Sequence, residues 1–170
     1  MAIDLIYYGH DTLRKKAEEI TLIDGALMDF IDSMYNVMYR SKGIGLAAPQ
    51  VDRSSRVVIL DIEDNKKNIV MELINPVIKD FSKTEEPYEE GCLSVPGIMG
   101  DVVRPTEISV SALNRDGKEI DFEAKGLLAR VIQHEVDHLN GILFVDHLED
   151  YYRNELRSEL KKIKKLNKRP

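Results

Sequence analysis

The chain of 170 residues has one cysteine, no long apolar run and no internal repeats. A single cysteine excludes an intramolecular disulfide and is typical of a reducing compartment. The first ten residues, "MAIDLIYYGH", contain neither a basic region nor an apolar stretch, so we expect no signal peptide and no membrane span. These absences predict a cytoplasmic protein that does not interact with membranes.

Charge is distributed unevenly along the chain. The net charge is -6, yet residues 151–170 hold eight Lys or Arg against two Glu. An acidic body disfavours general nucleic-acid binding, whereas a basic end can contact a phosphate-rich partner. The length suits one domain that buries roughly 70% of its unfolded surface. We therefore expect a single domain over residues 1–170, with a body over 1–146 and a basic helix over 147–170.

Hydrophobic periodicity predicts three helices. Residues 24–41 carry an apolar face, and "KGIG" then ends the pattern. Residues 126–141 begin and end with glycine and should form a buried central helix. Residues 147–167 should form an amphipathic helix with basic residues around an apolar stripe. That stripe consists of Tyr152, Leu156, Leu160 and Ile163.

The predicted strands lie between the first two helices. Residues 56–62 and 69–78 are rich in β-branched residues. "TEISVSAL" and "KEIDFEA" flank "NRDG", whose Asp116-Gly117 pair is a strong hairpin signal. This order favours an α+β fold, in which antiparallel β-sheets pack around the central helix, with an N-terminal helix and a C-terminal amphipathic helix.

The stretch "HEVDH" predicts a metal site on the central helix. Residues four apart lie on one helical face, so His134 and His138 can bind one ion. Glu135 lies beside that face, where its carboxylate can act as a general base. The alternative is a charged surface helix that happens to carry two histidines.

A catalytic site of this type has three protein ligands, so a third is needed. The metzincin pattern fails because Phe144 stands where a histidine is required. Glu159 of the following helix is possible, although a solvated position is favoured among its charged neighbours. A lone cysteine is often a small buried hydrophobe. Cys92, however, lies in "EEGCLSVPG", after a glycine and before a proline-glycine turn, and with two histidines it suits zinc or ferrous iron. We favour Cys92.

A third stretch, "GIGLAAPQ", covers residues 43–50. It lacks the ending of a phosphate-binding loop. Its small residues allow an extended substrate to approach the backbone, and Gln50 can donate an N–H to an oxyanion. Alone, this signal is weak.

In that order, "GIGLAAPQ", "EGCLS" and "QHEVDHLNG" closely resemble the three signature motifs of the peptide deformylases. The resemblance covers nearly the whole chain, including "LRKKAEEI" and the closing helix. Two departures are Asp11, where proline is common in relatives, and the variable segment "PGIMGDVVRP". They bear on loop shape and peptide contacts.

The resemblance implies removal of the formyl group from nascent peptides that begin with formylmethionine. Cys92, His134 and His138 would hold one divalent metal, and Glu135 would move the proton between water and the leaving amine. A thiolate ligand suits Fe(II) as well as Zn(II), and relatives generally work with iron. We therefore expect iron, with zinc or another divalent metal as alternatives.

The resemblance also implies roles around the metal. Gln50 and the N–H of Leu93 would stabilise the oxyanion. Leu127 and Val131 lie near the face of His134, where they can line a methionine pocket or simply pack in the core. Four further positions match the family's substrate site, namely Ile44, Gly45, Glu90 and Gly91. At Ile44, Gly45 and Gly91 the resemblance implies backbone hydrogen bonds to an extended peptide.

The basic end resembles a segment that some relatives use to bind the ribosome. Two rival functions remain: a metallopeptidase with Glu159 as its third ligand, and a ribosome- or RNA-binding module with a structural metal. Asp137 is either a partner of a ligand histidine or a solvated residue. We expect His10 and His147 to be structural or surface residues.

Overall fold

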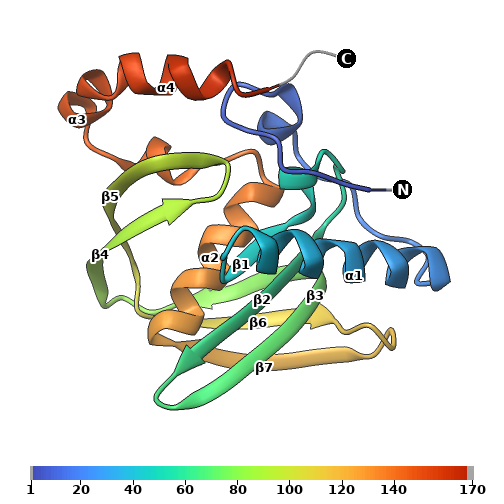
Figure 1. The fold of residues 1–170 in the computed structure, drawn as a ribbon. Helices are drawn as coiled ribbons and strands as arrows, with labels where there is room; N and C mark the ends of the chain where they lie inside the picture. The colour runs from blue at the N-terminus through green and yellow to red at the C-terminus, as the bar shows by residue number, and fades with distance from the viewer. Residues whose placement is uncertain (1, 168–170) are drawn as a thin grey trace.

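The computed structural model describes residues 2–167, which form two antiparallel sheets and four α-helices (Figure 1). A five-stranded sheet has the order β1-β2-β3-β6-β7, and β4 pairs with β5 in a separate hairpin. The strands are β1 (Gly45–Ala47), β2 (Val57–Asp64), β3 (Lys67–Phe81), β4 (Glu85–Cys92), β5 (Val95–Pro105), β6 (Glu107–Leu113) and β7 (Glu119–Lys125). The α+β prediction is confirmed, as is the hairpin at Asp116-Gly117, where Gly117 takes a positive φ of 78°.

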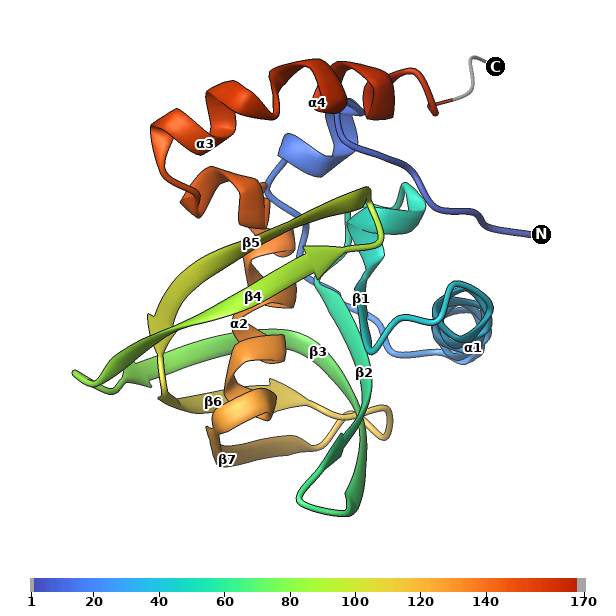
Figure 2. The same cartoon turned by 60° about the vertical axis from the view of Figure 1, so that its left-hand side comes forward.

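The helix α2 (Gly126–Leu139) lies between the five-stranded sheet and the β4–β5 hairpin, as Figure 2 shows. Its apolar residues, including Ile132 and Leu139, pack against Val58, Leu60 and neighbouring sheet residues in one core cluster. This burial holds both ends of the predicted metal-binding motif inside the protein. The prediction of a buried central helix is confirmed.

On the other face of β1 and β2 packs α1 (Gly25–Arg40). Its first turn is capped by Asp24, which accepts a hydrogen bond from the Leu27 N–H at 2.9 Å. It ends where predicted, because Lys42 takes a positive φ of 59° and the Gly43 N–H bonds back to the Met38 carbonyl. The chain then runs directly into β1.

The C-terminal part differs from the prediction of one helix over 147–167. A 3-10 turn covers Phe144–His147, and two short helices follow, α3 (Asp150–Glu155) and α4 (Arg157–Lys164). The helix starts late because Leu148 is extended, with ψ 152°. The predicted apolar stripe is confirmed, since its four residues pack in one cluster with the β5 residue Val95. The basic residues 168 and 169 lie outside the described residues.

The segment around Tyr7 and Tyr8, near the start of the chain, packs beneath the last helix (Figures 1 and 2). The Asn167 side chain accepts a hydrogen bond from the Tyr7 N–H at 2.8 Å and donates to the Tyr7 and Tyr8 carbonyls. Gly9 lies so close to Lys164 that a Cβ there would come within 2.4 Å of its side chain. In residues 2–167 we find no helix with the length and apolarity needed to cross a bilayer.

Candidate metal centre

The two histidines of α2 and the thiol of Cys92 come together at one point. Cys92 ends β4, and the two-residue turn at Leu93 and Ser94 brings the chain back into β5. The nearest ligand atoms of Cys92, His134 and His138 all lie within 4.8 Å of one another. The Sγ of Cys92 lies 3.3 Å from Nε2 of His138. The Pro96-Gly97 pair belongs to β5, so the turn expected there is displaced to Leu93 and Ser94.

The chemistry of these donors fits a divalent transition metal. One thiol and two imidazoles are the ligands that zinc and ferrous iron accept, and three protein ligands are characteristic of catalytic sites. His134 uses its Nδ1 to bond Glu90 at 2.9 Å, which leaves its Nε2 available to an ion. The two histidines are buried, with His134 9% and His138 1% exposed, while Cys92 is partly exposed on the cavity side.

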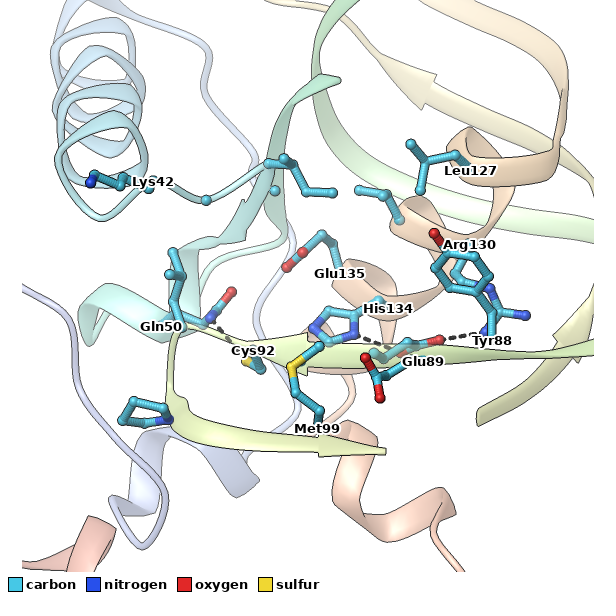
Figure 3. Close-up of a pocket in the computed structure, with 18 of the residues that line it drawn as sticks. Lys42, Gln50, Tyr88, Glu89, Cys92, Met99, Leu127, Arg130, His134 and Glu135 are labelled. Atoms are coloured by element: carbon cyan, nitrogen blue, oxygen red, sulfur yellow. Dashed lines mark hydrogen bonds and ion pairs between the residues drawn. The ribbon is translucent and has the colours of Figure 1, made fainter. Parts of the chain in front are cut away.

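Glu135 lies beside the cluster in the same cavity, as expected for a general base (Figure 3). Its Oε1 is buried and has no hydrogen-bond partner among the described residues, so it can accept one from a reacting molecule. Burial raises the pKa of Glu135 to about 7, and Glu90 and Asp137 contribute to this rise. A carboxyl group with such a pKa can both take and return a proton near neutral pH.

The electrostatics of the two histidines differ. Burial by itself lowers the pKa of His134, but Glu135, Cys92 and Glu90 together raise it well above the usual value. Burial and the neighbouring His134 lower the pKa of His138. His138 is therefore held neutral, which is the form in which imidazole binds metals.

Glu90 is the centre of a buried charge network. Besides His134, its carboxylate accepts hydrogen bonds from Arg104 at 2.7 and 3.0 Å and from Arg130 at 2.6 Å. Burial raises the pKa of Glu90, yet the bonds from His134 and Arg104 outweigh it and lower the pKa to about 2. Arg104 also reaches Asp137 at 2.9 Å. Glu90 was expected only as a substrate residue, but its strongest contacts orient a ligand histidine.

The side chain of Gln50 points at the cluster from the 3-10 turn Ala48–Val51, which follows β1. Its Nε2 lies 3.4 Å from the Cys92 sulfur and 3.2 Å from the Ser94 hydroxyl, while its Oε1 accepts from the Ala47 N–H. These contacts hold the amide with its N–H groups toward the metal centre. Leu93, the second expected oxyanion donor, follows Cys92 directly and lines the same cavity.

A cavity of about 490 Å³ opens beside the metal centre. All the substrate-site residues named from the sequence line it, namely Ile44, Gly45, Glu90, Gly91, Leu127 and Val131. The strand β1 is an edge strand of its sheet, so the side of Gly45 that does not face β2 has no strand partner. This arrangement can accept an extended peptide by strand addition.

Gly45 is where the backbone comes closest to the general base. A Cβ at this position would lie 2.6 Å from Glu135 Oε2 and 3.0 Å from a Val131 methyl group. Both neighbours are buried in α2 and leave no room for a side chain. Glycine is therefore required here by space and not by backbone conformation.

Several other sequence interpretations now have a place. Glu159 lies exposed on α4 and is not part of the ligand cluster. Phe144 is buried with its ring 6.2 Å from that of His134, so it packs against the centre and supplies no ligand. His10 bonds the Thr12 N–H, and His147 bonds Asp137 at 2.9 Å, which agrees with structural roles.

Sequence reasoning missed Tyr88, Met99 and Arg130, which line the cavity (Figure 3). It also missed Ser94, which bonds Gln50. Arg130 had a signal, because it lies one helical turn before His134 on α2. Tyr88 and Met99 had none, since their hairpin was not recognised as strands.

Comparisons with known proteins all lead to one family. The family described as Polypeptide deformylase matches residues 3–154. A peptide deformylase of Picosynechococcus sp. is 47% identical, covering 87% of this chain and 80% of the relative. A peptide deformylase of Natranaerobius thermophilus is 46% identical, covering 91% and 98%. The crystal structure of a peptide deformylase from Legionella pneumophila superposes with a TM-score of 0.88 at 41% identity, covering 98% of this chain and 97% of that one.

Proposed function

The chain belongs to the polypeptide deformylase family, and from this premise we propose how its residues remove the N-terminal formyl group of nascent peptides. The observation that carries the proposal is the cluster of Cys92, His134 and His138 beside Glu135 in one cavity. These three residues would hold one divalent cation. Bound there, such an ion supplies Lewis acidity to a water molecule and to the formyl oxygen.

The remaining chemistry belongs to the protein's own groups. Glu135 takes a proton from the water as its oxygen attacks the formyl carbon. Gln50 Nε2 and the Leu93 N–H donate to the carbonyl oxygen as its negative charge develops. Glu135 then returns the proton to the nitrogen as the C–N bond breaks, which yields formate and a free amine. Glu90 keeps the His134 ring in orientation throughout.

The cavity supports a methionine at the first position of the peptide. Leu127 and Val131 line it beside the metal centre, and Ile44 and Gly45 present the edge of β1. We propose that the peptide backbone pairs with this edge and with Gly91 on the opposite side, while the methionine side chain lies against Leu127 and Val131. The tight space beside Gly45 favours a small formyl group over a longer acyl chain.

The activity is tested by formate release from formyl-Met peptides, with the unformylated peptides as controls. We expect release only from the formylated series and loss of it in Cys92→Ser. Cleavage of internal peptide bonds at a comparable rate would overturn the proposal. No observation favours a metallopeptidase, because Glu159 is exposed on α4 and is not part of the ligand cluster.

We propose Fe(II) as the working metal, with zinc or another divalent ion as the alternative. The donor set suits both, and a thiolate beside ferrous iron is sensitive to oxidation. Protein purified without oxygen should contain about one iron per chain and lose activity on exposure to air as the iron is lost. A zinc content of one per chain with full activity in air would contradict this choice.

For partners and location, we propose a cytoplasmic protein that contacts the ribosome through the basic face of α4 and binds no DNA. Leu156, Leu160 and Ile163 are buried in the cluster that contains Val95, which supports a single domain over residues 1–170. For the same reason, deleting the last helices would remove core residues as well as charge. Exchanging exposed lysines is therefore a better test than truncation.

The test compares two triple variants by sedimentation with ribosomes at several salt concentrations. In the first, the three lysines on α4 and its end become glutamine: Lys161, Lys162 and Lys165. In the control, three exposed lysines elsewhere are exchanged: Lys15, Lys16 and Lys67. We expect salt-sensitive binding that weakens only in the first variant. Equal binding by both would refute a role for α4.

A further inference from the structure

A second cavity, of about 320 Å³, lies on a different face of α2 from the catalytic cavity. Gln133, Val136 and Asp137 line it, whereas His134 and Glu135 face the metal centre. Its other walls come from β3, β5 and the residues around α2, and they comprise Arg56, Pro76, Val77, Ile78, Phe81, Arg104 and Asn140. Of these residues, only Arg104 and Asp137 belong to the network around Glu90 described above, and none takes part in the proposed proton transfer or oxyanion contacts. We call this space the second cavity.

Two arginines line the second cavity, and only some of their guanidinium N–H groups have hydrogen-bond acceptors in the protein. Arg104 is 5% exposed, and its partners in residues 2–167 use three of its five N–H groups: Nε and Nη2 donate to Glu90, and Nη1 donates to Asp137. Arg56 donates from Nη1 to the Ala17 and Leu139 carbonyls and from Nη2 to Asn140. Within residues 2–167, each arginine thus keeps two N–H groups without a protein acceptor.

A small anion would complete this arrangement. The carboxylate of Asp137 already accepts from Arg104 and His147, each at 2.9 Å. Arg56 bonds carbonyl and amide oxygens rather than a carboxylate, although Glu19 lies near enough for its charge to act on it. A carboxylate matches guanidinium groups in charge and in geometry, and such bonds are stronger than neutral ones. The N–H groups of Arg56 and Arg104 that have no protein acceptor therefore favour a negatively charged ligand over a cation or an amide.

Other residues that line the second cavity are apolar. Val77 and Phe81 of β3 are 56% and 52% exposed, and Val136 closes the cavity from α2. Pockets that combine a few polar groups with apolar walls bind amphipathic small molecules. The volume is large enough for a carboxylate with a short aliphatic tail.

The second cavity is connected to the metal centre by one ion pair. Arg104 lines the second cavity and Glu90 lines the catalytic one, and the two side chains bond at 2.7 and 3.0 Å. Glu90 in turn holds Nδ1 of His134 at 2.9 Å. A ligand that binds Arg104 therefore affects Glu90, which orients His134.

We propose that the second cavity binds a small aliphatic carboxylate through Arg56 and Arg104, and that its occupancy modulates the metal centre through Glu90. The modulation rests on the proposed deformylase function, whereas the binding does not. If the carboxylate changes the affinity of the metal centre for its ion, the ion must change the affinity of the second cavity for the carboxylate by the same factor. The coupling can therefore be measured at either site.

Binding is tested with zinc-loaded full-length protein and two probes of equal size, butyrate and butyramide. Methyl NMR signals of Ile78 and Val136 should shift saturably with butyrate, and butyramide should bind at least about tenfold more weakly. Val77→Glu places a negative charge at the rim and should weaken butyrate binding by about tenfold or more. Val103→Glu, at a residue that is 58% exposed and lines neither cavity, should bind like the original protein.

Coupling is tested with cobalt(II)-loaded protein, whose thiolate absorption reports on the metal centre. Butyrate should change the spectrum with the same dissociation constant as the NMR shifts, and Val77→Glu should abolish the change at that concentration. A spectral change that survives Val77→Glu would mean direct binding at the metal and would overturn the proposal. So would equal binding of butyrate and butyramide, or the absence of NMR shifts. Deformylase activity measured without butyrate should stay unchanged in Val77→Glu. A negative result for butyrate binding can therefore be told apart from a lack of deformylase activity.

Discussion

The Cys92 sulfur lies 3.3 Å from Nε2 of His138, although 46 positions separate the two residues in the chain. The contact joins the end of a hairpin strand to the last turn of the central helix. Neither element can supply a three-ligand site alone. The metal centre is therefore a product of how the β4–β5 hairpin packs on α2.

Replacing Cys92 by serine should weaken metal binding by at least about 100-fold, because losses of residues that only support a ligand already reach 10–100-fold. Competition with a coloured chelator measures this. Glu159→Gln should bind metal like the original protein, since Glu159 is exposed on α4. The opposite pattern would restore Glu159 as a ligand.

Glu135→Gln should retain the metal and lower kcat by about 10²–10⁴-fold, as expected for loss of general acid–base catalysis. The amide has nearly the same shape, so the buried site should keep its packing around the position of Oε1. Metal content and formate release are measured on the same sample. A variant with full turnover would show that another group moves the proton.

Gln50→Ala should lower kcat by about 10²–10³-fold with little change in KM, because its N–H groups act on charge that develops during the reaction. The side chain is held by Ser94 and by the Ala47 N–H, so its position is set before substrate binds. Steady-state kinetics with a formyl-Met peptide give both constants. A rise in KM alone would assign Gln50 to ground-state binding instead.

Gly45→Ala should depress turnover while the metal is retained. The added methyl group would lie 2.6 Å from Glu135 Oε2, so the carboxylate has to move away from its position in the cavity. Gly97→Ala is not a suitable control because Gly97 takes a positive φ of 82°. Gly25→Ala is, because no atom lies within 4 Å of the added group and Gly25 starts α1. Equal turnover in the two variants would remove steric restriction as the reason for glycine at position 45.

The residues that the structure brings together at the candidate site were identifiable from the sequence, because each stands in a short motif whose spacing matches a physical requirement. His134, Glu135 and His138 follow helical periodicity, and Cys92 was favoured by its glycine and by its ligand chemistry. The network around Glu90 was not predictable. Arg104 and Arg130 are single charged residues in the sequence, and only the packing of β5 on α2 brings them to one carboxylate.

The hairpin strands were also missed, for a reason that the structure makes clear. In β4, "EEPYEEGC", acidic residues and a proline replace the alternation of apolar side chains that marks a strand. In β5 the burial does alternate, but Pro96 and two glycines resemble a loop. These strands are specified by their pairing with each other and by the helices on either side, not by local propensity. The late start of the C-terminal helix likewise depends on the turn at Phe144–His147.

The ion pair between Arg14 and Asp146 should make stability depend on pH. Burial raises the pKa of Asp146, but the bonds from Arg14 and the Leu143 N–H outweigh it, so the folded-state pKa is below the usual value of 3.8. The stabilisation is therefore present above about pH 4 and is lost as the pH falls through the folded-state pKa. In urea unfolding, Asp146→Asn should be less stable than the original protein at pH 7, and the difference should shrink below pH 4.

A matched comparison for this pair is Asp150→Asn, whose partner Arg153 is one turn away on the exposed surface of α3. Exposed pairs of this kind contribute little to stability. We expect its unfolding curve to follow that of the original protein at both pH values. A difference at Asp146 that persists unchanged at low pH would show that shape, not charge, sets the effect.

The packing of α3 and α4 on β5 has a consequence for the order in which the enzyme matures. When synthesis has passed α2, all three ligand residues already exist, but Leu156, Leu160 and Ile163, which cover Val95 behind the cysteine hairpin, do not. We expect such an arrested chain to bind metal poorly until its final twenty or so residues emerge, as zinc capture by stalled chains of increasing length can measure. An enzyme that acts on nascent chains would then acquire its own activity only after α3 and α4 have been synthesised and have packed on β5.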